Sequence, residues 1–400
     1  MAHVFATTTS ARCYPRAGTP SGRLCGTIDA DFSRLQGQAL LRTSSNARRG
    51  DVLLHAVASD DRGNVPCVPS KRALIIGISG QDGSLLSELL LSEGYEVIGV
   101  VRQSTSTRFE NLEPIRGRIE LHQADVLSEV SLVDVLSASE PHEVYNLASP
   151  SFVPMSWKQP VLTAEFAAVG VTALLEAIRR VDDGVRFYQA SSSEIFGESR
   201  EVPQTEETPL APVTPYGVAK AYGHLITRSY RRQYGLYASS GILYNHESPR
   251  RPLDFVTRKI SHAAAAISLG LKSEVLLGNL DARRDWGYAG DYVRAMWLVL
   301  QQDEADDFVI ASGQTHSVRE LAEAAFAHVG LDWEEHVRVD DTLIRGKAEL
   351  HDIVGDSSKA REQLGWSPRV DFDGLVQLLV DADVERLRSR AEPVETLADI

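Results

Sequence analysis

From Lys71 onward, short apolar runs alternate with segments of helical periodicity, and this alternation constrains the fold more than any other feature. Parallel strands need connections long enough to hold a helix, and those helices cover the faces of the sheet. The chain therefore predicts an α/β fold with a doubly wound parallel sheet. The runs interpreted as strands are ALIIG, YEVIGVV, IELHQAD, EVYNLAS and RFYQASSS, with helices over 84–94, 133–141 and 163–181.

The pattern becomes less regular after Tyr244, where Pro249 and Pro252 interrupt it. Helices are still expected near 260–269 and 375–387. We interpret residues 71–244 as a dinucleotide-binding domain. Residues 245–390 are interpreted mainly as a smaller C-terminal α/β lobe that supplies the substrate pocket and crosses back to the first domain, and 391–400 as a tail.

The first seventy residues differ in composition from the rest. They contain no Lys and no Glu, and their eight Arg and five Asp give about +3, which leaves about −17 for the remainder. Such a segment buries too little apolar surface to order itself, so disorder is expected. Its Arg, Ser, Thr and Ala content is also typical of organelle transit peptides. Both interpretations stand: a cytoplasmic protein with a tail, or a plastid or mitochondrial one whose mature N-terminus lies beyond Met1.

Composition excludes several classes of protein. The net charge of −14 argues against nucleic-acid binding, because neutralising phosphates needs clustered Lys and Arg. No uninterrupted apolar stretch approaches the ~20 residues of a membrane span, so no membrane association is expected. The cysteines are Cys13, Cys25 and Cys67, so the catalytic part has neither a disulfide framework nor a thiolate zinc site, and no metal is predicted.

Three glycines, Gly77, Gly80 and Gly83, follow the first apolar strand and open a helix. Glycine permits a tight turn and a close backbone approach to a pyrophosphate, which then meets free N–H groups at the positive end of the helix dipole. A glycine triplet alone is a weak signal, but its place between a strand and a helix predicts a Rossmann-type dinucleotide site.

The choice between the two nicotinamide dinucleotides depends on Arg102, which ends the next strand. An NAD enzyme usually has an acid here, whereas an arginine suits the 2′-phosphate of NADP. Asp125 fits an adenine-side contact and the segment 146–151 fits the nicotinamide ribose. The predicted cofactor-binding residues are Gly77, Gly80, Gln81, Asp82, Gly83, Arg102, Asp125, Val126, Leu147, Ser149, Ser151, Lys220, His246 and Arg251.

Tyr216 and Lys220 lie four residues apart at the start of a predicted helix, so they share one face. A nearby ammonium favours the phenolate, and we expect it to lower the tyrosine pKa so that the phenol can exchange a proton with a sugar hydroxyl. Ser192 and Glu194 follow a strand at the carboxyl edge of the sheet, where such folds bind ligands. These four residues, Ser192, Glu194, Tyr216 and Lys220, are the predicted catalytic group.

These segments together resemble the extended short-chain dehydrogenase/reductase superfamily and, more narrowly, the GDP-mannose 4,6-dehydratase family. The resemblance covers residues 73–387 and is most specific at NHESPRR and at LGNLDARRDWG. It also includes GISGQDGSLL, FYQASSSEIFG, TPYGVAK, FVIASGQTHSVRE and GWSPRV.

The resemblance implies a homo-oligomeric enzyme, dimer or tetramer, that converts GDP-mannose to GDP-4-keto-6-deoxymannose with bound NADP. It implies that Tyr216 is the base at sugar C4, assisted by Lys220, and that Glu194 handles the C5 proton and the C6 hydroxyl. It also implies that His246 and Arg251 lie on the cofactor side. The predicted substrate-binding residues are Ser192, Asn245, Lys259 and Arg284.

Two other functions remain open. Pro150, Phe152 and Gln103 depart from the family's pattern near the cofactor, which leaves a net reductase of a 4-keto-6-deoxy GDP-sugar, or another nucleotide-sugar epimerase or dehydratase, as alternatives. A dinucleotide-binding regulatory protein without catalysis is an alternative of another class. The presence of Ser192, Glu194, Tyr216 and Lys220 together favours the enzyme.

Overall fold

The computed structural model describes residues 70–102, 109–343 and 353–391. The described residues all belong to one compact unit. The predicted extension over 1–70 and tail over 391–400 therefore lie outside the described residues, except for Ser70 and Ala391. The boundary at 244/245 stays a prediction.

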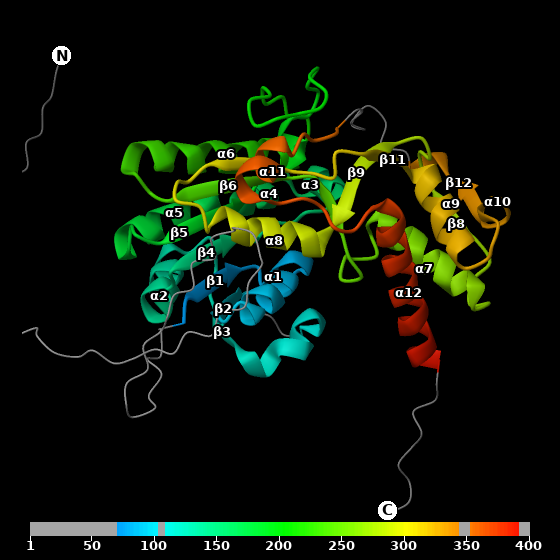
Figure 1. The fold of residues 1–400 in the computed structure, drawn as a ribbon, viewed down its shortest axis with the longest axis horizontal. Helices are drawn as coiled ribbons and strands as arrows, with labels where there is room; N and C mark the ends of the chain where they lie inside the picture. The colour runs from blue at the N-terminus through cyan, green and yellow to red at the C-terminus, as the bar shows by residue number, and fades with distance from the viewer. Residues whose placement is uncertain (1–69, 103–108, 344–352, 392–400) are drawn as a thin grey trace, which may run out of the picture. The chain divides into compact units, whose positions relative to one another are not determined.

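A seven-stranded parallel sheet forms the larger core (Figure 1), which confirms the predicted doubly wound α/β fold. The two halves of the sheet run outward from β1, so the strand order reverses between β1 and β4. Ligands bind at such a reversal, beyond the carboxyl ends of the strands. In spatial order the strands are β10 (Asp307–Ile310), β6 (Ala238–Leu243), β5 (Arg186–Ala190), β4 (Glu143–Asn146), β1 (Arg72–Ile76), β2 (Glu96–Val101) and β3 (Ile119–Gln123).

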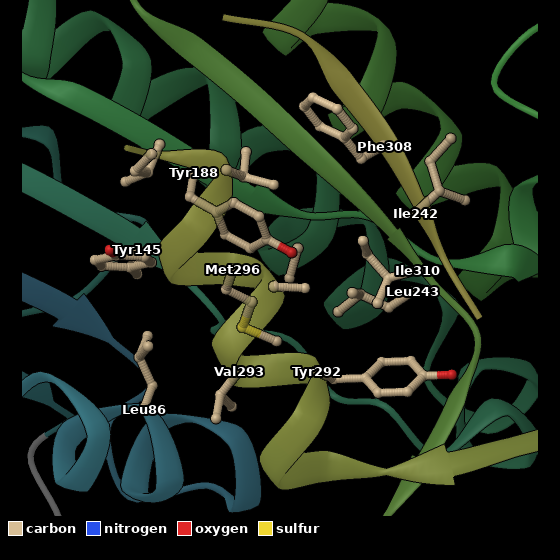
Figure 2. Close-up of a cluster of buried hydrophobic side chains, with 14 of the residues drawn as sticks. Leu86, Tyr145, Tyr188, Ile242, Leu243, Tyr292, Val293, Met296, Phe308 and Ile310 are labelled. Carbon is tan, nitrogen blue, oxygen red and sulfur yellow. The ribbon is translucent and has the colours of Figure 1, made fainter. Parts of the chain in front are cut away.

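Successive residues of β1 enter different cores because side chains alternate across a strand. Ala73 and Ile75 pack with α1 and α8, whereas Leu74 and Ile76 pack with α2 and α5. Figure 2 shows the first of these clusters, in which Tyr145 and Tyr188 of the sheet meet Met296 of α8. The flanking helices are α1 (Gln81–Ser92), α2 (Glu129–Ser139), α5 (Gly170–Val181), α6 (Pro215–Tyr234), α8 (Ala289–Val299) and α11 (Ser358–Leu364).

The second core lies among helices α7, α9 and α12, beside two small sheets (Figure 1). The sheets have the orders β11-β9-β7 and β12-β8. Segments after residue 245 also return to the large sheet: β10 pairs with β6, and α8 packs on α1. The elements are β7 (Asn245–Glu247), α7 (Val256–Ser268), β8 (Val275–Leu277), β9 (Arg283–Tyr288), β11 (Thr315–Ser317), α9 (Val318–His328), α10 (Trp333–His336), β12 (Val337–Val339) and α12 (Phe372–Ala391).

The remaining helical segments are short, but two of them, α4 (Pro160–Ala164) and η2 (Glu165–Val169), run directly into α5. The segment η2 is π-helical and joins α4 to α5. The continuous stretch Pro160–Val181 is the one helix among the described residues that is long and apolar enough to cross a membrane, and half of it is buried inside the structure. The others are α3 (Val153–Lys158), η1 (Glu110–Arg118), η3 (Ser193–Ile195) and η4 (Asp341–Leu343).

Candidate functional site

The glycine loop between β1 and α1 needs glycine for two different reasons. Gly77 has a φ of 88°, a conformation that side chains rarely adopt, and a Cβ there would lie 3.0 Å from the backbone of Ala148. A Cβ on Gly83 would lie 2.4 Å from the Gly77 carbonyl oxygen. Gly80 begins α1 without a side-chain cap. The first turn of α1 therefore presents backbone N–H groups to the cavity, an arrangement that fits a dinucleotide pyrophosphate.

A cavity of about 740 Å³ lies at the carboxyl edge of the large sheet and extends to the second core. Its wall is formed by the glycine loop, by segments that follow β4 and β5, and by α6, β7, α7 and β9. The structure thus brings together most of the predicted site. The predicted residues that line it are Gly77, Gly80, Gln81, Asp82, Gly83, Leu147, Ser149, Ser151, Ser192, Glu194, Tyr216, Lys220, Asn245, His246, Arg251, Lys259 and Arg284.

The predicted catalytic group is held by short local hydrogen bonds. Thr214 caps α6: its hydroxyl accepts from the Gly217 amide at 2.9 Å and lies 3.4 Å from the Glu194 carboxylate, to which it donates. Ser192 begins η3 and hydrogen-bonds the Tyr216 hydroxyl. A hydroxyl, a phenol and a carboxylate therefore converge at one end of the cavity.

Burial raises the pKa of Tyr216 to about 12; the Ser192 hydrogen bond opposes this shift and the Glu194 charge adds to it. The expected lowering of this pKa by Lys220 is therefore wrong for this arrangement. The Lys220 ammonium donates to the Ala190 carbonyl at 2.9 Å and lies 5.6 Å from the centre of the Tyr216 ring. Burial also lowers the pKa of Lys220 to about 8. Desolvation, which disfavours the charged form of each group, is the largest cause of both shifts.

Asp82 and His246 form a partly buried ion pair between the start of α1 and β7. The imidazole donates through Nδ1 to the Tyr244 carbonyl at 2.7 Å and through Nε2 to the Asp82 carboxylate at 2.9 Å, so the ring is an imidazolium. Although burial alone would favour the neutral acid, the charge of His246 and its hydrogen bond lower the pKa of Asp82 to about 2. The His246 ring also stacks on Tyr292, with centroids 4.8 Å apart. This pair fixes the glycine loop to the second core.

Arg251, on the loop after β7, presents its guanidinium to the cavity. Its Nε lies 3.3 Å from the Glu247 carboxylate, and its guanidinium carbon lies 3.6 Å from the centre of the Phe255 ring. Phe255 in turn packs edge-on against Phe152, with centroids 5.4 Å apart. The sequence departure at Phe152 thus creates an aromatic wall beside a predicted cofactor-binding cation.

Three predicted cofactor residues do not line the cavity. Arg102 is exposed at the end of β2, with its guanidinium carbon 4.8 Å above the Phe166 ring. Asp125 accepts from the Leu127 amide at 3.0 Å, and Val126 is buried in the core that includes α2 and α5. Arg102 follows β2, the neighbour of the strand before the glycine loop, and Asp125 and Val126 follow β3, the next strand outward. A dinucleotide that extends from this loop across the sheet edge would reach them, so their roles stay predictions.

The sequence analysis missed several residues of the site, chief among them Thr214, Lys158 and Asn279. Thr214 does not line the cavity itself but holds Glu194, and its signal was a threonine before Pro215, where a helix begins. Asn279 lies within the LGNLDA segment that was noted as a whole. Lys158 ends a short helix and carries no recognisable sequence signal. Within the described parts of the chain, no group of three His, Cys, Asp or Glu side chains could hold a metal ion.

Comparison with known proteins places the chain among nucleotide-sugar enzymes. Residues 74–379 match the family model described as GDP-mannose 4,6 dehydratase. The chain is 47% identical over 329 residues to GDP-mannose 4,6 dehydratase 1 of Arabidopsis thaliana, covering 79% of this chain and 91% of the relative. It is 46% identical over 348 residues to the human GDP-mannose 4,6 dehydratase, covering 80% and 93%.

Solved structures show the same fold. UDP-glucose 4-epimerase from Thermotoga maritima, with UDP-glucose, has a TM-score of 0.70 at 26% identity and covers 79% of this chain and 99% of its own. The dTDP-glucose 4,6-dehydratase from Streptomyces venezuelae, with NAD bound, has a TM-score of 0.69 at 26% identity and covers 80% and 99%. The family model matches most of this chain, and the two curated relatives named above are 46–47% identical to it. This chain therefore belongs to the GDP-mannose 4,6-dehydratase family.

Proposed function

We propose that this chain is a hydro-lyase that converts GDP-mannose to GDP-4-keto-6-deoxymannose. The observation that carries the proposal is the convergence of Ser192, Glu194 and Tyr216 in the cavity that also holds the glycine loop. Family membership identifies the sugar nucleotide, because the relatives are named for GDP-mannose. The fold and the loop support a nicotinamide dinucleotide as the cofactor, and solved neighbours hold NAD.

Each of the four predicted catalytic side chains has its own role in the reaction. When bound, the dinucleotide supplies a hydride acceptor and donor. Tyr216 takes the C4 hydroxyl proton and gives a proton back to C5 as the hydride returns to C6, and Ser192, which hydrogen-bonds the phenol, orients the C4 oxygen. Glu194 takes the proton from C5, which is acidic beside the C4 ketone, and delivers a proton to the C6 hydroxyl as it leaves as water. Lys220 supplies positive charge behind Tyr216, which a phenol of raised pKa needs in order to ionise.

Cations at the other side of the cavity suit the diphosphate of the substrate. Lys259 projects from α7 and Arg284 from β9, and both line the cavity with Asn245 of β7. Burial lowers the pKa of Lys259 because it disfavours the charged ammonium. A bound diphosphate would place negative charge beside this side chain and so favour the ammonium. This arrangement supports GDP-sugar binding between β7, α7 and β9.

The direct test is to incubate the chain with GDP-mannose and NADP and to follow both the product mass and the absorbance of NADPH. A dehydratase gives a product lighter by one water without accumulation of NADPH. In a parallel incubation with a 4-keto-6-deoxy GDP-sugar and NADPH, consumption of NADPH in proportion to product would instead establish the reductase. Nucleotide binding without turnover of any GDP-hexose would favour the regulatory protein.

Glu194→Gln sharpens this test because it separates oxidation from elimination. Tyr216 is intact in this variant, so NADPH should accumulate up to about one equivalent per site while the dehydrated product fails to form. Glu198→Gln, an exposed acid four residues on, is the matched control and should keep full turnover. Unchanged dehydration by Glu194→Gln would exclude the proposed role of Glu194.

We propose NADP rather than NAD because Arg102 stands at the end of β2, where the strand presents no acid. Its stacking on Phe166 leaves the guanidinium exposed for a 2′-phosphate. Loss of a charge-assisted contact costs about 1.5–3 kcal/mol, so Arg102→Ala should weaken NADPH binding at least about tenfold. NADH binding, measured by the same fluorescence titration, should change little. An equal loss for both dinucleotides would contradict the NADP assignment.

We also propose that the chain forms a homo-oligomer through α6 and the helical segments packed on it. The exposed apolar residues of α6, Val218, Tyr222 and Leu225, recur at helical spacing, while Tyr216 and Lys220 are buried on the side of the cavity. Neighbouring exposed residues are Trp157, Val161, Leu162 and Val169. Exposed apolar surface of this kind marks protein interfaces. Tyr222→Asp should reduce the mass measured by light scattering, whereas Leu271→Asp, at an apolar residue that is exposed elsewhere, should not.

A further inference from the structure

The loop between β7 and α7, residues 248–255, carries the cation Arg251 into the cavity. On one side the loop is attached to α1: Arg250 donates to the Ser84 hydroxyl at 3.0 Å and to the Glu88 carboxylate at 2.6 Å. These bonds join it to the helix that begins at the glycine loop. The place of Arg251 then depends on what holds the backbone of residues 249–251 on the other side.

Two arginines hold that backbone. Arg258 of α7 donates from one nitrogen, Nη1, to the carbonyl of Pro249 at 2.9 Å and to that of Arg251 at 2.7 Å. Arg386 of α12 donates to the same Pro249 carbonyl at 3.1 Å. The backbone of Arg251 is thus fixed by a guanidinium that is itself only 2% exposed.

Both arginines converge on one carboxylate, that of Asp383 in α12, which is fully buried. Its Oδ1 accepts from Arg258 Nη2 at short range and from Arg386 Nη1 at 2.9 Å. Its Oδ2 accepts from the Ser261 hydroxyl at 2.7 Å. A buried guanidinium without a partner is strongly unfavourable, so Asp383 supplies the opposite charge that holds Arg258 oriented beneath the loop. This carboxylate neither lines the cavity nor contacts any residue of the predicted site.

We propose that Asp383 is a positioning residue for dinucleotide binding, acting from α12 through Arg258 and Arg386 on the backbone of Arg251. The inference rests on the proposed function only in that Arg251 faces the dinucleotide. The C-terminal helix thereby becomes part of the cofactor site, although it lies more than a hundred residues beyond the loop it holds. Ser261 shares the carboxylate but does not contact the loop, which makes it the natural control.

The test measures NADPH affinity by fluorescence titration, together with the urea midpoint of unfolding, in the full chain. Arg386→Met removes one of the two donors to the Pro249 carbonyl and should raise the dissociation constant about fivefold, the effect of one hydrogen bond. Asp383→Asn should raise it further. Ser261→Ala should lower the urea midpoint without changing NADPH affinity.

A double-mutant cycle separates positioning from a general structural effect. In an Arg251→Met background, Arg386→Met should cause no further loss of NADPH affinity, because the residue through which it acts is gone. An equal loss in both backgrounds, or none in either, would overturn the inference. Arg386 is partly exposed, so this cycle decides the question even if Asp383→Asn does not fold. Failure of the unaltered chain to bind NADPH would instead refute the proposed cofactor.

Discussion

Asp82→Asn tests the ion pair that fixes the glycine loop to the second core. The asparagine side-chain oxygen can still accept from the protonated His246 ring, so the substitution removes charge while it keeps the shape and the hydrogen bond. His246 holds the pKa of Asp82 at about 2, against an ordinary value of 3.8. At about 1.36 kcal/mol per pKa unit, the ionised carboxylate stabilises the folded chain by about 2.5 kcal/mol near pH 7.

The sign follows from a folded-state pKa below the unfolded one. The stabilisation is fully present above the unfolded value and is lost as the pH falls toward the folded one. By this relation it is still about 2.3 kcal/mol at pH 4.5 and about 1.3 kcal/mol at pH 3. The difference in unfolding free energy between the native chain and Asp82→Asn, from urea titrations, should therefore shrink by about 1 kcal/mol over that interval. A difference that stays constant with pH would refute the reasoning.

Three further predictions concern catalysis and the glycine loop. Tyr216→Phe should abolish turnover of GDP-mannose while calorimetry shows its binding largely retained, and undiminished turnover would refute the role of Tyr216 as base. Because burial lowers the pKa of Lys220 to about 8, turnover should fall about tenfold per pH unit above that value as the ammonium is lost. Lys220→Arg should remove this alkaline limb of the pH profile. A limb that is unchanged in the variant would argue against Lys220 as its cause. Gly83→Ala places a methyl group 2.4 Å from a carbonyl oxygen and should lower the unfolding free energy by about 1–3 kcal/mol. Gly117→Ala, at a position with open space around it, should not lower it. Equal effects of the two substitutions would contradict the packing argument.

The sheet and the glycine loop were predictable because their causes are local. A strand buried on both faces must be continuously apolar, and the turn at Gly77 needs a conformation that only glycine adopts freely. Tyr216 and Lys220 share a face because helical periodicity requires it. The helix expected near 375–387 is present as part of α12, which extends a few residues further at each end. Such boundaries depend on capping and packing, which a hydrophobic pattern does not specify.

Other properties of the site depend on residues far apart in the chain. The pKa of Tyr216 was predicted in the wrong direction because spacing shows that an ammonium is near but not how deeply both groups are buried. The pairing of Asp82 with His246, 164 residues apart, has no sequence signal. The same is true of Asp383 and Arg258, whose attraction matters only because folding removes both from water. The fold and the available chemical groups can be read from the amino-acid sequence, since they follow from periodicity and residue type. The charge state of those groups and the contacts that hold them in place cannot, because desolvation and long-range contacts arise on folding.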